Sequence, residues 1–222
     1  MRRAATAACA LIGATVLASA QEAPKFTTEP PPRFGVAPRL KSFPQNTAKA
    51  ALQSAIEAVE GGQYAYLLAH LMDPQFVDAR VADRAKQLEP GVEVELAKLR
   101  ESQKQNPVGI APEARVPDDP IQFRAMAARE ARTRAFRLLV RDVQDKLTDD
   151  PTLLKDLRRF LREGTVADQP GGARVGLADV KDRAVFLKQL DGRWFVENRQ
   201  SDEKAEPKKE PEEKKGPEDK KP

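Results

Sequence analysis

The chain has 222 residues, of which 40% are hydrophobic and 32% are charged, a charge-rich composition for a globular protein. The 12 glycines follow no three-residue period, which excludes a collagen, and the mean hydropathy of −0.60 excludes a polytopic membrane protein. The net charge of +4 is a small difference between 38 basic and 34 acidic residues, so it does not indicate nucleic-acid binding.

Residues 1–20 are predicted to be a secretory signal peptide. Arg2 and Arg3 supply the positive start, an Ala-rich apolar run covers residues 4–17, and residues 18–20 have the small-x-small pattern that signal peptidase accepts. The apolar run is shorter than the roughly 20 residues that a membrane-spanning helix needs. We therefore expect cleavage before Gln21, export to the periplasm or the medium, and no membrane span in the mature chain. An uncleaved N-terminal anchor is the alternative.

The only cysteine of the sequence, Cys9, lies inside this apolar run. Cleavage removes it, so the mature protein is expected to hold its fold by its core, without disulfides. A catalytic thiol, a CxxC redox pair and a thiolate metal site are excluded for the same reason.

Composition divides the remaining chain into three parts. Residues 21–44 contain six prolines and are predicted to be a Pro-rich linker, because proline fixes φ and favours extended backbone before it. Residues 201–222 are a low-complexity tail of lysine, acidic residues and proline, which is predicted to be disordered because it has no large apolar residue to bury. A single folded domain is expected over residues 45–200.

The first part of this domain is predicted to be helical. Asn46 or Thr47 can cap a helix from residue 48, and Gly61-Gly62 ends it. Asp150-Pro151 begins another helix with proline at its first position, and Gly164 ends that one. The expected helices cover residues 48–60, 64–72, 76–88, 92–103, 121–147 and 151–163, with a break at Pro90-Gly91 and a Pro-rich loop at 106–120.

After Gly171-Gly172 the apolar period changes from 3.6 to 2, which predicts strands at 174–179, 183–190 and 193–198. Asp191-Gly192 is a two-residue hairpin signal, because a type I′ turn needs positive φ at both positions. This turn sets Gln189 opposite Trp194 and Leu187 opposite Val196. One face of the hairpin then carries Val185, Leu187, Trp194 and Val196 and is expected to face the core. The other carries Phe186, Leu190 and Phe195 beside Lys188 and Glu197.

His70 is the only histidine and the first candidate for chemistry. On a helix, Tyr66 at i−4 and Asp73 at i+3 share its face, and a Tyr-His-Asp set could serve acid–base catalysis. The alternative is a half-buried structural histidine, with Asp73 turning the chain before Pro74. Catalysis would also require a pocket, which sequence alone does not show.

The helix at 121–147 contains the second set of candidates. Arg134, Arg137 and Arg141 align with Glu130 on a face predicted to be solvated, opposite an apolar stripe made by Phe136, Leu139, Val143 and Leu147. Arg129 and Arg132 lie on the apolar side, where they either bind an anion in a cleft or extend their stems along the surface. No aromatic residue alternates with these arginines, so nucleic-acid binding is not expected.

Motifs for phosphate, dinucleotide, serine-hydrolase and zinc-protease chemistry are absent from the sequence. One histidine and no mature cysteine make a protein-built zinc or copper site improbable. The acidic residues Asp73, Asp78 and Asp83 lack the spacing of a calcium loop. We expect no cofactor and no metal.

The order of these parts resembles the nuclear transport factor 2-like superfamily, which includes SnoaL-like proteins. The resemblance rests on the helix at 47–59, on GGQYAYLLAHLMDP (61–74) and on RAVFLKQLDGRWFVENR (183–199), and residues 83–147 would be a helical insertion. It implies a cone-like fold with a pocket. Enzymes of the family use a Tyr/Asp or His/Asp set, for which Tyr64, Tyr66, His70 and Asp73 are the only nominees. None stands in a family motif, so no catalytic role is carried over.

Together these observations predict an exported, helix-rich α+β domain with a small C-terminal antiparallel sheet. Its expected role is non-catalytic binding of a protein or small-molecule partner that the sequence does not identify. A pocket enzyme of SnoaL-like type and a structural protein of the cell envelope are the alternatives. A large closed apolar pocket lined by His70 or Arg132 would favour an enzyme or a ligand binder. An exposed apolar patch would favour an interaction module.

Overall fold

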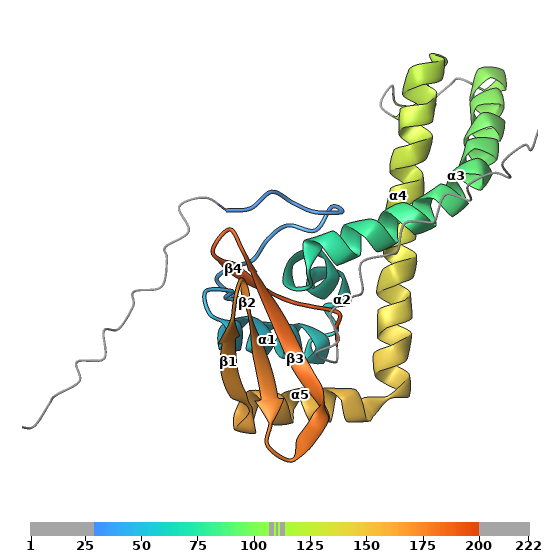
Figure 1. The fold of residues 1–222 in the computed structure, drawn as a ribbon. Helices are drawn as coiled ribbons and strands as arrows, with labels where there is room; N and C mark the ends of the chain where they lie inside the picture. Colours follow the sequence, from blue (N-terminus) through green and yellow to red (C-terminus); the bar gives the residue numbers. More distant parts are fainter. Residues whose placement is uncertain (1–28, 107–108, 110, 112–113, 200–222) are drawn as a thin grey trace, which may run out of the picture.

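A computed structural model describes residues 29–106, 109, 111 and 114–199, with backbone alone at residues 181 and 182. The predicted signal peptide and tail lie outside these residues. The fold is α+β, as predicted, and has a body and two long helices that extend from it (Figure 1). In chain order the elements are α1 (Ala48–Glu60), α2 (Tyr64–Tyr66), the π-helix η1 (Leu67–Leu71), α3 (Pro74–Gln105), α4 (Pro120–Asp149), α5 (Pro151–Glu163), β1 (Thr165–Gln169), β2 (Gly172–Leu177), β3 (Val180–Leu190) and β4 (Arg193–Val196).

The predicted capping of α1 and α5 is confirmed. The Thr47 side chain accepts a hydrogen bond from the amide of Ala50 at 3.1 Å, and Asp150 accepts one from the amide of Thr152 at 3.1 Å. Gly61 follows α1 and Gly62 has φ +64°, the left-handed conformation that lets the chain leave a helix. Gly164 follows α5.

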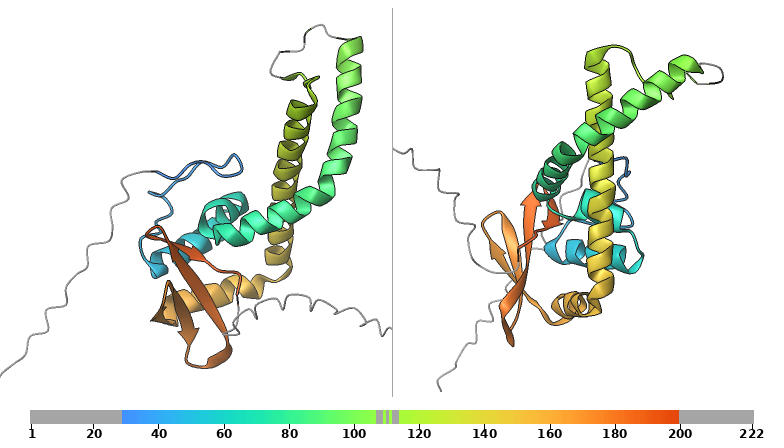
Figure 2. Two further views of the ribbon diagram at one scale, coloured as in Figure 1. Left: turned by 45° about the horizontal axis from the view of Figure 1, so that its top comes forward. Right: turned by 90° about the vertical axis from the view of Figure 1, so that its right-hand side faces the viewer.

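The predicted helix break at Pro90-Gly91 is wrong. Helix α3 runs through Pro90, and its axis changes direction near its middle (Figure 2), as expected of a proline that lacks an amide hydrogen and collides with a preceding carbonyl. Proline inside a helix costs about 3 kcal/mol. Ala85 and Val92, on either side of it, are buried in the cluster shared with α4. This packing offsets the cost and keeps the helix continuous.

Small residues let α3 and α4 approach closely. Ala127, Ala131 and Ala135 recur every four residues on α4, and each is fully buried with Val77 and Val81 of α3. The predicted apolar stripe of α4 belongs to the same cluster, in which Phe136 is buried and Leu139 and Val143 are partly buried. The buried alanines therefore extend this contact face beyond the residues that the sequence predicts for it.

The sheet is antiparallel, with strand order β1-β2-β3-β4. The predicted hairpin register is confirmed: Gln189 pairs with Trp194 and Leu187 with Val196, and Asp191 and Gly192 have φ of 48° and 77°. Strand β1 was not predicted, because its five residues are all exposed and lack an alternating apolar pattern.

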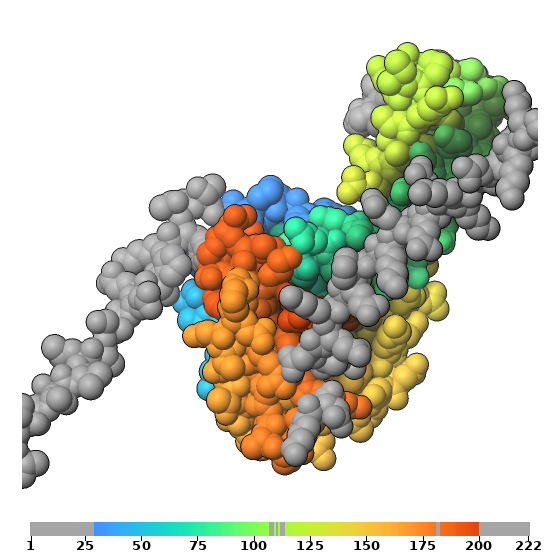
Figure 3. Space-filling view, viewed as in Figure 1, coloured from blue at the N-terminus to red at the C-terminus, as the bar shows by residue number. Residues whose placement is uncertain are grey.

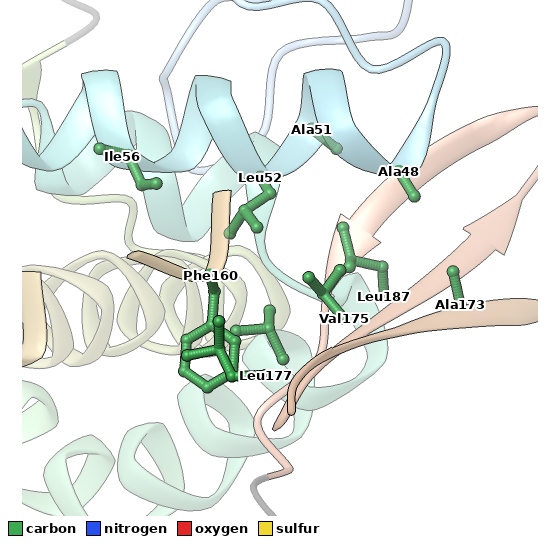
Figure 4. Packing of buried hydrophobic residues seen from close by; sticks show 10 residues of the cluster. Ala48, Ala51, Leu52, Ile56, Phe160, Ala173, Val175, Leu177 and Leu187 are labelled. Atoms are coloured by element: carbon green, nitrogen blue, oxygen red, sulfur yellow. The ribbon is translucent and has the colours of Figure 1, made fainter. Parts of the chain in front are cut away.

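The expected core face of the hairpin is confirmed. Val175 and Leu187 point from the sheet towards Leu52 and Ile56 of α1 and Phe160 of α5 (Figure 4). Trp194 and Val196 are partly buried against this cluster. The opposite face is also covered: Phe186 and Phe195 are buried, and the guanidinium of Arg199 lies 3.9 Å from the ring centre of Phe186.

The predicted domain boundary at residue 45 leaves out a packed segment. We call residues 33–45 the strap. In it, Arg33 and Val36 form an antiparallel bridge, and the Phe34 ring stacks on Phe136 of α4 with centroids 4.4 Å apart. Phe43 is buried against Tyr66. The second half of the predicted Pro-rich linker therefore belongs to the folded body.

Candidate functional site

Tyr66 and His70 lie together in the body, as the sequence predicted. Their ring centroids are 5.0 Å apart, and both side chains are almost completely buried. The Tyr66 hydroxyl accepts a hydrogen bond from the amide of Arg39 at 3.0 Å. The Nε2 atom of His70 lies 2.8 Å from the carbonyl oxygen of Val36, so Nε2 carries the hydrogen and donates it. Both polar groups therefore bind the strap.

The electrostatics of this pair keep both groups uncharged near neutral pH. Burial lowers the pKa of His70, although its bond to Val36 opposes the shift. Burial also raises the pKa of Tyr66, against the hydrogen bond from Arg39. A neutral, buried imidazole bound to a backbone carbonyl fits a structural role better than an acid–base one.

Asp73 does not complete a catalytic set. Its Oδ1 accepts a hydrogen bond from the amide of Gln75 at 3.1 Å and so caps α3. Its Oδ2 lies 3.8 Å from Nζ of Lys188 on β3. Within the described part of the chain these are its side-chain partners, and no bond joins it to His70. The structure thus brings Tyr66 and His70 together and directs Asp73 to a different task.

Gln45 connects this cluster to the sheet. Its buried Nε2 donates to the carbonyl oxygens of His70 at 2.8 Å and of Trp194 at 2.9 Å. The amide of Trp194 donates to the Gln45 carbonyl at 3.0 Å. The strap, the π-helix and strand β4 therefore meet at one side chain, a structural junction that sequence analysis missed.

A groove lies between the strap, the start of α3 and the middle of α4. It has a volume of about 450 Å³ and includes both arginines singled out from the sequence. Its lining residues are Arg33, Phe34, Gly35, Asp78, Arg129, Arg132 and Thr133. Arg33 donates to the carbonyl of Ala69 and to Oδ1 of Asp78, each at 2.7 Å. The sequence does not indicate the contribution of Arg33, because this residue lies in the predicted Pro-rich linker.

Three other arginines of α4, which are Arg134, Arg137 and Arg141, agree with the prediction of a solvated face with a Glu130–Arg134 pair. Arg134 binds Glu130 at 2.9 Å and also Glu95 of α3 at 2.6 Å. Arg137 and Arg141 are exposed.

The outer halves of α3 and α4 form a second candidate region. We call residues 91–105 and 120–128 the arm; it extends from the body (Figure 3). Of the five large apolar residues that are exposed in the described chain, three lie on the arm: Val94 (56% exposed), Leu99 (46%) and Ile121 (79%). The others are Leu138 of α4 and Val166 of β1.

Among the described residues, no three His, Cys, Asp or Glu side chains gather where they could hold a metal ion. None of the described helices has the length and apolarity needed to span a bilayer.

No family model matches the sequence, and no curated protein and no solved structure matches it. The resemblance to the nuclear transport factor 2-like superfamily stays a prediction. The candidate sites of this chain are the arm, the groove and the buried Tyr66–His70 pair.

Proposed function

We propose that this chain is a non-catalytic interaction domain whose arm binds a partner protein. The observation that supports this most strongly is the concentration of exposed aliphatic side chains on the arm. Val94, Leu99 and Ile121 leave apolar surface in water, which is unfavourable by about 25 cal/mol per Å². A partner that covers these residues removes that cost.

The architecture of the arm fits this role. Its two helices pack on each other through the buried side chains of Val92 on α3 and Ala127 on α4. The main core clusters of the sheet and of α1 contain no arm residue. The arm is therefore free to serve a partner without supporting the packing of the sheet.

The enzymatic alternative has less support. Of the acid–base candidates from the sequence, Tyr66 and His70 lie together, and the Tyr66 hydroxyl and the Nε2 atom of His70 already bind the strap. The groove is lined by Arg132, but its lining does not include His70. No observation favours a SnoaL-like reaction.

We also propose that the protein is exported. This rests on the sequence of residues 1–20 alone, which combine a basic start, a short apolar run and a small-residue cleavage pattern. N-terminal sequencing of exported protein is expected to begin at Gln21. A chain that still begins at Met1 would contradict the proposal.

The arm proposal is tested by photo-cross-linking in cells that naturally produce the protein. A photoreactive amino acid is placed at Leu99 or Ile121 on the arm, or at the exposed Lys49 on α1 as the control. We expect a discrete protein adduct from both arm positions and none from Lys49. Equal labelling at all three positions, or no adduct, would contradict the proposal.

A further inference from the structure

The groove beside the arm contains more positive charge than the protein itself neutralises. Three arginines line it, Arg33, Arg129 and Arg132, together with one acidic residue, Asp78. The Asp78 carboxylate is bound to Arg33 at 2.7 Å. Arg129 and Arg132 are exposed, and no ion pair links either of them to a described residue.

This arrangement differs from that of other arginines on the same pair of helices. Arg134 has two carboxylate partners, and Arg84 binds Asp142 at 2.7 Å. Glu95, Glu130 and Asp142 of α3 and α4 therefore pair with arginines outside the groove. The two unpaired guanidinium groups are three residues apart on one helix, so their side chains are neighbours.

The strap fixes the opposite wall of the groove. The stacking of Phe34 on Phe136 holds the strap against α4, and the bond from Arg33 to the Ala69 carbonyl orients its guanidinium. The turn at Phe34-Gly35 has φ of 52° and 79°, a conformation that commits the backbone to a tight reversal. The wall is thus built before any ligand arrives, which lowers the entropic cost of binding.

We infer that this groove binds a small dianion, a phosphate or a dicarboxylate, through Arg129 and Arg132. Guanidinium groups bind both kinds of oxyanion in paired hydrogen bonds. The volume of about 450 Å³ exceeds that of a single phosphate and leaves room for the rest of a ligand. The inference is independent of the arm proposal, because it concerns a different surface and a different class of ligand.

Calorimetric titration of the mature chain with pyrophosphate and with succinate, at low and at physiological salt, tests this site. We expect saturable binding of at least one of the two, weakened by added salt. Binding of pyrophosphate alone identifies a phosphate ligand, and binding of succinate alone identifies a dicarboxylate. If neither anion binds, the inference is wrong.

Paired variants separate a built site from overall charge. R129Q/R132Q removes the two groove arginines, and R124Q/R137Q removes two exposed arginines of the same helix that lie outside the groove lining. The groove variant is expected to weaken binding by roughly tenfold or more, and the control variant by less than about threefold. All four side chains are exposed, so both variants should unfold at the wild-type temperature. Equal weakening by the two variants would show that only net charge matters and would overturn the inference.

Discussion

Gln45→Met is the most informative substitution in the body, because it keeps an unbranched side chain and removes only the amide. In the native protein, this amide donates to the carbonyls of His70 and Trp194. The variant leaves both acceptors without a partner inside the body. Each such loss costs about 1–3 kcal/mol.

The net destabilisation by Gln45→Met is smaller than the largest value that the loss of two hydrogen bonds could give. The Oε1 atom of Gln45 is buried and has no partner, so its removal returns part of the free energy. We therefore expect Gln45→Met to lower the free energy of unfolding by about 2–4 kcal/mol. A loss of 1 kcal/mol lowers the melting temperature of a domain of this size by about 2–4 °C, so we expect the melting temperature to drop by roughly 4–16 °C.

Urea unfolding at pH 7 measures the effect, with Gln53→Met as the matched control. Gln53 lies on α1, where its exposed amide donates to Glu57 at 2.8 Å. Its substitution should change stability by less than about 0.5 kcal/mol. If Gln45→Met and Gln53→Met both lower the free energy of unfolding by less than about 0.5 kcal/mol, the side chain of Gln45 does not join the strap to the body, and the prediction is wrong.

Three further predictions follow from single positions. Trp194→Ala should lower the free energy of unfolding by about 2–3 kcal/mol. This is less than the loss of a fully buried indole would cost, because Trp194 is only partly buried against the sheet cluster. Native tryptophan fluorescence that is red-shifted and readily quenched by iodide would contradict this packing. Burial lowers the pKa of His70, so below pH 6.5 the unfolded chain binds more protons than the folded chain. The free energy of unfolding should therefore fall as the pH drops through the folded pKa. If His70→Gln shows the same dependence of this free energy on pH as the native chain, the prediction is refuted. Gly62→Ala, at φ +64°, should destabilise the protein by about 1–2 kcal/mol, whereas Gly91→Ala, in open space within α3, should stabilise it by about 0.5–1 kcal/mol. If the two variants shift the melting temperature in the same direction, the backbone conformations given for these glycines are contradicted.

The features that sequence analysis predicted correctly depend on local rules. Thr47 and Asp150 cap helices through atoms two or three residues away. The turn at Asp191-Gly192 determines the pairing of Gln189 with Trp194, since a two-residue loop leaves one register. Each of these needs only neighbouring residues, so the sequence contains the whole physical cause.

The features that were missed depend on contacts between distant segments. Proline at position 90 indicates a break, and only the packing of α3 on α4 explains why the helix continues. Strand β1 has no apolar pattern and is held by pairing with β2.

The candidate sites show the same limit. Arg129 and Arg132 were singled out because they lie on the apolar side of their helix, and the structure places both in the groove. The third arginine, Arg33, comes from the strap, and only the stacking of Phe34 on Phe136 brings it there. An aromatic residue before glycine within a Pro-rich segment was the one local signal that could have indicated a packed turn.

The central claim is that the arm is the surface that binds a partner, and one comparison tests it directly. Val94→Lys and Val166→Lys each place a charge at an exposed valine, the first on the arm and the second on strand β1 of the body. The affinity of each variant for the protein captured by arm cross-linking is measured with purified components. We expect Val94→Lys to weaken binding at least tenfold, about 1.4 kcal/mol, and Val166→Lys to leave it unchanged. Undiminished binding by Val94→Lys, or equal loss in both variants, would contradict the account.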